Sequence, residues 1–113
     1  MVRIYIAGKV TGCDYAEACF KFAEAERTLT HNGAIAVNPM RFVPENSDWQ
    51  HAMKLCIKSL VSCDVLYLLE DWHESEGAVF EVMVAKRLGI VIQTEDGRRK
   101  TEVGRRKTED GRI

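Results

Sequence analysis

The sequence predicts an α/β fold in which a parallel sheet of about four strands lies between layers of helices. Strand-type and helix-type patterns alternate from residue 2 to residue 93. Short connections join them, which is typical of strand–helix–strand units with parallel strands. The predicted strands are almost continuously apolar, as expected where helices cover both faces of a sheet.

The first strand and helix have clear sequence boundaries. Residues 2–7 form an apolar, β-branched run that ends at Gly8, which predicts a buried strand. Residues 14–31 carry apolar side chains at helical spacing. Asp14, followed by Glu17, is typical of a capping box, and Asn32-Gly33 supplies the end of the helix.

A second strand and helix follow. Residues 34–37 predict a short strand, and residues 39–47, which include two prolines, predict a loop. Ser47 or Asp48 then caps a helix whose apolar stripe runs from Trp49 to Leu60.

The last elements complete the sheet. Residues 64–69 predict the third strand, residues 70–76 a charged loop, residues 77–88 the third helix and residues 89–93 the fourth strand. This succession predicts a flavodoxin-like three-layer sandwich with strand order 2-1-3-4.

Composition defines one domain and an extension. The chain has 113 residues, of which 46% are hydrophobic, enough for a single core over residues 1–93. Residues 94–113 instead repeat the pattern TEDGRRK and contain seven basic and five acidic residues. We expect a solvated, flexible tail; the alternative is a weak tether to nucleic acid or to a partner.

Several classes of protein are excluded at this stage. No apolar run approaches the about 20 residues of a membrane span, and the N-terminus does not resemble a signal peptide. The formal net charge of −1 makes nucleic acid an unexpected partner. A reducing cytoplasm is the expected location, because the four cysteines form neither a CxxC motif nor a cluster with histidine. These are Cys13, Cys19, Cys56 and Cys63.

The topology predicts where a ligand would bind. In open parallel sheets the site lies at the carboxyl ends of the strands, where the winding reverses. This rule selects the loops after Ala7 and Leu69. Residues 8–12 (GKVTG) follow the first strand and allow close backbone approach to a ligand, although an ordinary turn explains them equally well.

Glu81 is the most informative single residue. Its neighbours over residues 78–85 are all apolar, so its carboxylate is expected to avoid bulk water. Burial raises a carboxyl pKa and marks a candidate functional group, whereas most helical glutamates are simply solvated. Tyr5 on the first strand is expected to be buried, where core packing is the ordinary role of a tyrosine. Ser75 is expected to open the third helix, either as a plain cap or as a ligand contact.

Three segments together resemble the nucleoside 2-deoxyribosyltransferase-like superfamily. They are residues 5–12 (YIAGKVTG), residues 63–68 (CDVLYL) and residues 75–81 (SEGAVFE). Within it the chain is similar to small deoxynucleoside 5′-monophosphate N-glycosidases and to an uncharacterised bacterial and phage branch.

The resemblance implies an N-glycosidase or deoxyribosyl transferase that cleaves the base–sugar bond of deoxynucleosides or their 5′-monophosphates. Glu81 would be the nucleophile, and Tyr5 would orient it or the sugar. The pocket would need no metal or organic cofactor, and the chain would form a homodimer or a larger homo-oligomer. The substrate-binding residues implied are Gly8, Val10, Thr11 and Gly12 at the sugar and base, and Ser75 and Gly77 at the 5′ end.

One departure from the family pattern supports an alternative. Cys56 stands where the family usually has an aspartate that assists the leaving base. A thiol is a poor substitute for a carboxylate, and a positioned proton-transfer group commonly contributes about 10² to 10⁴ in rate. The alternative function is therefore a catalytically weak or silent module that binds or senses nucleotides.

Overall fold

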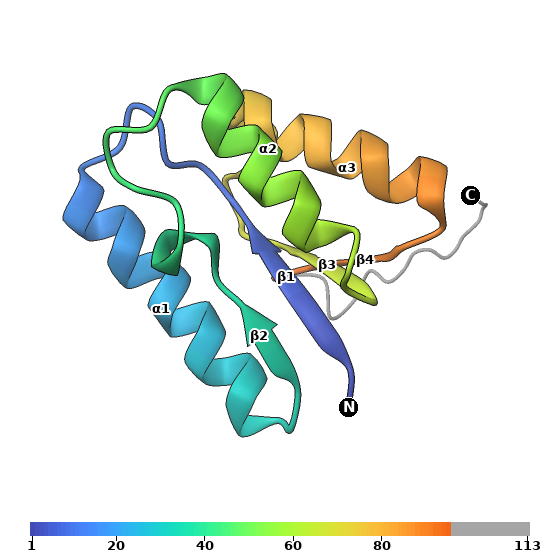
Figure 1. Cartoon of the computed structure of the whole chain (residues 1–113). Coiled ribbons are helices and arrows are strands. Elements are labelled where there is room, and N and C mark those ends of the chain that lie inside the picture. Colours follow the sequence, from blue (N-terminus) through green and yellow to red (C-terminus); the bar gives the residue numbers. More distant parts are fainter. Residues whose placement is uncertain (96–113) are drawn as a thin grey trace.

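A computed structural model describes residues 1–95, and it contains a four-stranded sheet with helices on both sides (Figure 1). Two short 3-10 helices, η1 and η2, lie in the segments that the sequence predicts as loops. The elements in chain order are β1 (Arg3–Ala7), α1 (Tyr15–His31), β2 (Ile35–Val37), η1 (Pro39–Arg41), α2 (Trp49–Leu60), β3 (Val65–Leu68), η2 (Trp72–Glu74), α3 (Glu76–Leu88) and β4 (Val91–Thr94).

The sheet confirms the predicted topology. Its strand order is β2-β1-β3-β4, and every neighbouring pair is parallel. Tyr5 in the central strand β1 pairs with Val37 of β2 and with Leu66 of β3. Helix α1 lies on one side of the sheet and helices α2 and α3 lie on the other (Figure 1). The order reverses between β1 and β3, so this is where parallel-sheet geometry opens a crevice.

Alternate side chains of β1 enter two separate cores, because successive residues of a strand point to opposite faces. Ile4 and Ile6 pack with Phe22 and Leu29 of α1. The other core lies beneath α2 and α3 and includes the following buried residues: Tyr5, Ala7, Leu60, Leu66, Leu68, Ala78, Val82 and Ala85. Both faces of the sheet are therefore covered, which explains why its strands are apolar throughout.

Local capping chemistry fixes the helix ends. Asp14, Asp48 and Ser75 each accept a hydrogen bond from the backbone N–H three residues later, at 3.1, 2.8 and 3.0 Å. These bonds satisfy backbone donors that the first helical turn leaves unpaired. Of the two candidates for capping α2, Asp48 is the one that does so. Helix α3 ends at Leu88 and is capped by Gly89, whose φ of 73° is a left-handed conformation that glycine adopts at little cost.

Some predicted boundaries shift by one or two residues. Asp64 lies before β3 rather than within it, and its carboxylate accepts a 2.9 Å hydrogen bond from the backbone N–H of Arg3. Strand β4 extends to Thr94, one residue beyond the predicted end of the domain, and the N–H of Glu95 donates to the carbonyl of Leu68 at 2.8 Å. The rest of the predicted tail, residues 96–113, lies outside the described residues.

Two further features of residues 1–95 bear on the sequence predictions. None of the helices in this part of the chain has the length and apolar character needed to cross a membrane. All four cysteines are free thiols.

Two phenylalanines on α1 provide a matched test of the packing. Phe22 is 1% exposed in the core under α1, whereas Phe20 is 65% exposed. We expect Phe22→Ala to lower the free energy of unfolding by about 3–5 kcal/mol, because it leaves a cavity in a packed core. Phe20→Ala should change it by less than about 0.5 kcal/mol. Urea denaturation of both variants measures the difference, and equal losses would contradict this packing.

Candidate active site

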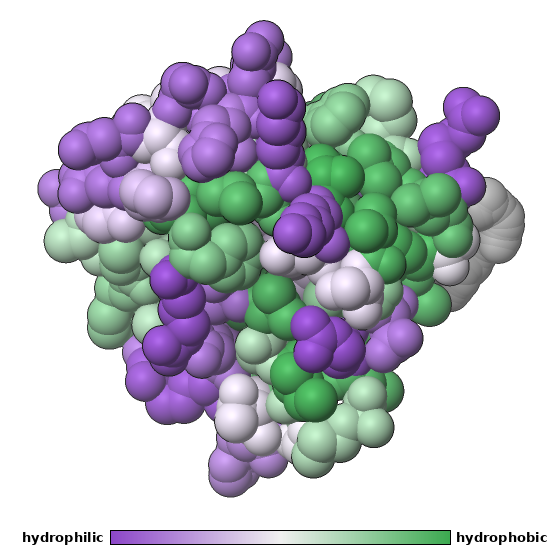
Figure 2. All heavy atoms as spheres, viewed as in Figure 1, coloured by the Kyte–Doolittle hydropathy of each residue, from purple (hydrophilic) through white to green (hydrophobic). Residues whose placement is uncertain are grey.

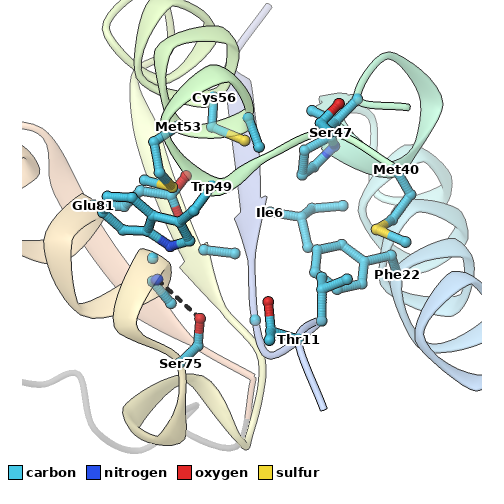
Figure 3. Close-up of a pocket in the computed structure, with 18 of the residues that line it drawn as sticks. Ile6, Thr11, Phe22, Met40, Ser47, Trp49, Met53, Cys56, Ser75 and Glu81 are labelled. Atoms are coloured by element: carbon cyan, nitrogen blue, oxygen red, sulfur yellow. Dashed lines mark hydrogen bonds between the residues drawn. The ribbon is translucent and has the colours of Figure 1, made fainter. Parts of the chain in front are cut away.

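A cavity of about 570 Å³ opens at the carboxyl end of β1, within the size range of small-molecule sites. Its wall combines the loop after β1, the segment from η1 to α2, and the beginning of α3. Figure 3 shows Cys56 and Met53 from α2 beside Glu81 from α3, with Phe22 and Met40 on the opposite side. The cavity therefore lies where the topology predicts a ligand.

The central polar contact joins β1 to α3. The Tyr5 hydroxyl donates a 2.7 Å hydrogen bond to Oε2 of Glu81. Tyr5 is 0% exposed and Glu81 is 4% exposed, yet both side chains line the cavity. Hydrogen bonds to a carboxylate are strong where water is largely excluded. The structure thus brings together the two residues for which the resemblance implies the roles of nucleophile and orienting group.

Burial controls the charge of Glu81. Desolvation raises the pKa of its carboxyl from 4.5 to about 7, while the hydrogen bond from Tyr5 opposes that increase. Desolvation, together with the neighbouring Glu81 carboxyl, also raises the pKa of Tyr5 well above its ordinary value, so Tyr5 remains a donor at neutral pH. Near pH 7 the site therefore holds both protonated and ionised Glu81.

The face that α3 turns inward explains this burial. Ala78, Glu81, Val82 and Ala85 are buried and follow one another at helical spacing, whereas Met83 is 54% exposed. The apolar neighbours of Glu81 in sequence thus lie partly on the outside of α3, while the carboxylate faces the sheet.

Cys56 completes this group from α2. Its half-buried thiol lines the cavity and interacts electrostatically with Tyr5 and Glu81. Burial raises the pKa of Cys56 from 9.0 to about 11, so the thiol stays protonated at neutral pH. The position where the sequence resemblance implies an aspartate is therefore adjacent to the Tyr5–Glu81 pair, but it holds an uncharged group.

The loop after β1 forms another part of the wall. Gly8, Val10 and Thr11 line the cavity. A Cβ atom at Gly8 would lie 2.7 Å from Cδ1 of Leu69, so only glycine allows this close approach of the loop to β3's end.

Gly12 is not among the described residues that line the cavity. It has a φ of 87° and lies in a turn closed by a 3.1 Å hydrogen bond from the Cys13 N–H to the Val10 carbonyl. Glycine suits this left-handed position, so the turn accounts for Gly12 directly.

The start of α3 supplies the opposite wall. Ser75 and Gly77 both line the cavity, and Oγ of Ser75 is also the helix cap. A Cβ atom at Gly77 would lie 3.0 Å from Sδ of Met53, so glycine allows α2 and α3 to approach closely here. The Ser75 hydroxyl can still donate its proton to a ligand while its oxygen accepts from the helix.

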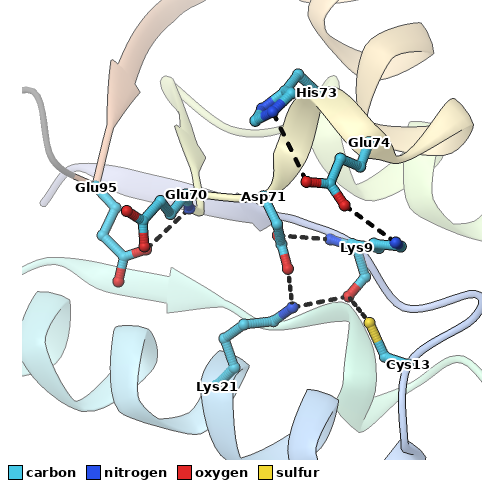
Figure 4. A network of polar contacts seen from close by, with 8 residues as sticks. All are labelled: Lys9, Cys13, Lys21, Glu70, Asp71, His73, Glu74 and Glu95. Atoms are coloured by element: carbon cyan, nitrogen blue, oxygen red, sulfur yellow. Dashed lines mark hydrogen bonds and ion pairs between the residues drawn. The ribbon is translucent and has the colours of Figure 1, made fainter.

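A polar network holds these two walls together (Figure 4). The Lys21 ammonium forms an ion pair with Asp71 and donates to the carbonyl of Lys9 at 3.0 Å. The backbone N–H of Lys9 donates to Asp71 Oδ1 at 3.0 Å, and its ammonium pairs with Glu74 at 3.1 Å. The loop after β1 is therefore fastened to the segment after β3.

Sequence reasoning missed several residues of the wall. Tyr15, Glu45 and Trp49 line the cavity, and the Trp49 ring lies 6.5 Å from that of Phe80. The strand-end rule could have found the segment after β2, because it also begins at a carboxyl end. Trp72 is not among the described residues that line the cavity, and it packs against the core under α2 and α3.

Residues 1–95 contain no group of three or more histidine, cysteine, aspartate or glutamate side chains arranged to hold a metal ion.

Comparison with solved structures identifies the fold class. The chain matches the 2-deoxyribosyltransferase from Leishmania mexicana with a TM-score of 0.63 and 21% identity, over 83% of this chain and 63% of that one. It matches the 2-deoxyribosyltransferase from Bacillus psychrosaccharolyticus with a TM-score of 0.62 and 14% identity, over 81% of this chain and 70% of that one. The protein therefore has a nucleoside 2-deoxyribosyltransferase-like fold, as the sequence resemblance predicts.

Family membership is equally definite. A family model described as a domain of unknown function (DUF4406) matches residues 2–94, and the chain belongs to this family. A search of the curated proteins found no match. The chain spans less than two thirds of the Leishmania structure that it matches.

The raised pKa of Glu81 predicts a pH-dependent effect on stability. The carboxyl holds its proton more tightly in the folded state, so unfolding becomes easier as the pH rises from about 4.5 through about 7. Glu81→Gln has no carboxyl to ionise here, so it does not lose stability in this way. We expect the free energy of unfolding of the variant, minus that of wild type, to increase by up to about 3 kcal/mol between pH 5 and pH 8.

Thermal and urea unfolding at both pH values measure this change, with Glu24→Gln as the control. Glu24 is an exposed α1 residue paired with Arg27, so its substitution removes one carboxylate outside the cavity. A difference between Glu81→Gln and wild type that does not vary with pH would show that Glu81 titrates normally.

Proposed function

We propose that the protein cleaves the base–sugar bond of deoxynucleosides or their 5′-monophosphates, as an N-glycosidase or deoxyribosyl transferase with Glu81 as the nucleophile. The observation that carries this proposal is the buried carboxylate of Glu81, oriented by Tyr5 at the wall of a ligand-sized cavity. The solved structures with a similar fold are 2-deoxyribosyltransferases, which supports the same substrate class.

The first step forms a covalent intermediate. A Glu81 carboxylate oxygen attacks C1′ of the sugar, while the C1′–N bond breaks and the base leaves with its electron pair and takes up a proton. Positive charge develops at C1′ in the transition state, and a nearby carboxylate stabilises it. Tyr5 holds the attacking group in one orientation, which reduces the entropic cost of the reaction.

The second step releases the sugar. Water or a second base attacks C1′, the ester bond to Glu81 breaks, and the carboxylate is regenerated. Attack by water needs a proton acceptor and yields free deoxyribose or its phosphate, whereas attack by a base yields a new nucleoside. The chemistry requires no redox step.

Cys56 favours a second candidate function. Its thiol remains uncharged at neutral pH, so it does not supply the carboxyl that the resemblance implies at this position for assisting the leaving base. A protein that keeps the cavity but turns over slowly would bind or sense nucleotides.

Assembly with a second copy is also a proposal. Apolar side chains gather over α2 and α3 on the face shown in Figure 2. On α3, Val79, Phe80 and Met83 are 42%, 39% and 54% exposed. An apolar surface of this kind supports a homodimer or larger homo-oligomer.

The location of the protein in the cytoplasm also remains a prediction.

Activity should depend on the ionisation of Glu81. We expect base release from deoxynucleosides to rise with pH across about 7, because only the carboxylate attacks C1′. Tyr5→Phe should move this midpoint to higher pH, since it removes the hydrogen bond that lowers the pKa of Glu81. Glu81→Gln should reduce turnover by about 10³-fold or more.

Chromatography of the released base at a series of pH values measures these effects. Circular dichroism and urea unfolding show whether each variant is folded. Turnover in folded Glu81→Gln equal to that of wild type would contradict the proposed nucleophile.

Replacement of Cys56 distinguishes the two candidate functions. If the missing carboxyl limits catalysis, Cys56→Asp should increase base release by about 10²-fold, whereas Cys56→Ser should not. The serine variant controls for loss of the thiol. A robust wild-type rate that falls in Cys56→Asp would contradict the weak or silent alternative.

A further inference from the structure

The cavity carries a marked excess of negative charge. Its wall includes four carboxylate side chains, from Glu45, Glu74, Glu76 and Glu81. Among the described residues that line it there is no lysine, arginine or histidine. Glu81 is buried, whereas the other three are exposed at the wall. A ligand that carries its own negative charge would therefore meet carboxylates at a wall whose described side chains supply no positive charge.

The two lysines of the network in Figure 4 already have partners. The ammonium of Lys9 pairs with Glu74 at 3.1 Å, and that of Lys21 pairs with Asp71 (Figure 4). The ring of His73 lies 3.9 Å from the other carboxylate oxygen of Glu74. Binding of a phosphate by Lys9 would thus compete with an existing ion pair.

The start of α3 is a source of positive potential at the cavity. A helix N-terminus carries about half an elementary charge. Glu76 lies in this first turn, and Glu74 lies just before the capping residue Ser75. The Glu76 carboxylate alone therefore outweighs the helix end, because the charge of Glu74 is balanced by the Lys9 ammonium. A phosphate monoester would add a further charge of about −1.5 to −2 at pH 7.

An uncharged ligand fits the same wall. Apolar side chains of Phe22, Met40, Val43, Trp49 and Met53 line the cavity, which suits a neutral base. A free 5′-hydroxyl can donate a hydrogen bond to a carboxylate, but a phosphate has no comparable donor when fully ionised. The chemistry of the wall thus favours binding of the nucleoside over binding of its 5′-monophosphate, although the two differ only at the 5′ position.

We propose that the cavity selects an uncharged deoxynucleoside with a free 5′-hydroxyl and rejects the corresponding 5′-monophosphate through Glu74 and Glu76. This inference rests on the proposed function, and it narrows that function to nucleosides. Selection acts at binding, so it can be tested without turnover.

Calorimetry with a 2′-deoxynucleoside and its own 5′-monophosphate tests the inference, using the full chain and the Glu81→Gln variant, which prevents attack on C1′. At low salt the nucleoside should bind at least about tenfold more tightly than the monophosphate. The ratio of the two dissociation constants should become smaller as ionic strength rises, because salt screens exposed charges.

Two substitutions at the wall should reduce the discrimination. Glu76→Gln should improve monophosphate binding several-fold and leave nucleoside binding within about twofold. Glu74→Gln should improve it further, because it removes a carboxylate and also releases the Lys9 ammonium. Glu24→Gln, an equal change of charge on α1 outside the cavity, should change neither affinity.

The outcomes separate this inference from the proposed function. Preferential binding of the nucleoside without any base release supports the inference and overturns the proposed chemistry. Base release from the monophosphate as fast as from the nucleoside overturns the inference and supports the chemistry. Binding of neither ligand overturns both.

Discussion

The site depends on one interaction, the hydrogen bond from Tyr5 to Glu81. It joins the central strand to α3 across 76 residues of sequence and holds a carboxylate in a place almost closed to water. Two opposing effects act on that carboxylate. Desolvation favours its protonated form, and the tyrosine hydroxyl favours its ionised form, which leaves the pKa of Glu81 near 7 rather than in the range of a solvated glutamate. A group balanced in this way can be ionised at neutral pH without being fully hydrated.

The rest of the fold keeps this pair beside the cavity. Parallel strands bring the loop after β1 next to the segment after β3, and Lys21 and Asp71 fasten the two together. Because residues 8 and 77 are glycines, no Cβ atom crowds Leu69 beside the loop after β1 or Met53 beside the start of α3. Because these contacts come from three different layers, the position of the site is a property of the whole sandwich rather than of one motif.

Much of the fold could be predicted from the sequence because its signals are local. The apolar strands, the capping residues and the glycines after the first strand and the first helix specify the elements, and parallel connections then restrict the strand order. Glu81 was detectable because it interrupts an apolar run. Its bond to Tyr5 was suggested only by family resemblance, since no spacing rule relates residues 76 positions apart. The pairing of Lys21 with Asp71 could not be predicted, because nothing in sequence separates these residues from other surface charges. Element ends shifted where tertiary hydrogen bonds, such as that from Arg3 to Asp64, decided them.

Rapid quenching of the protein with a deoxynucleoside, followed by mass spectrometry of its peptides, addresses the central claim most directly. A carboxylate nucleophile predicts a transient deoxyribosyl ester, so the peptide that contains Glu81 should gain the mass of one deoxyribosyl group. The modification should map to Glu81 itself and disappear once water or a second base has attacked C1′ and released the sugar. Base release accompanied by an adduct on another residue would contradict the account, and so would release that proceeds without an adduct under conditions where the second step is slow.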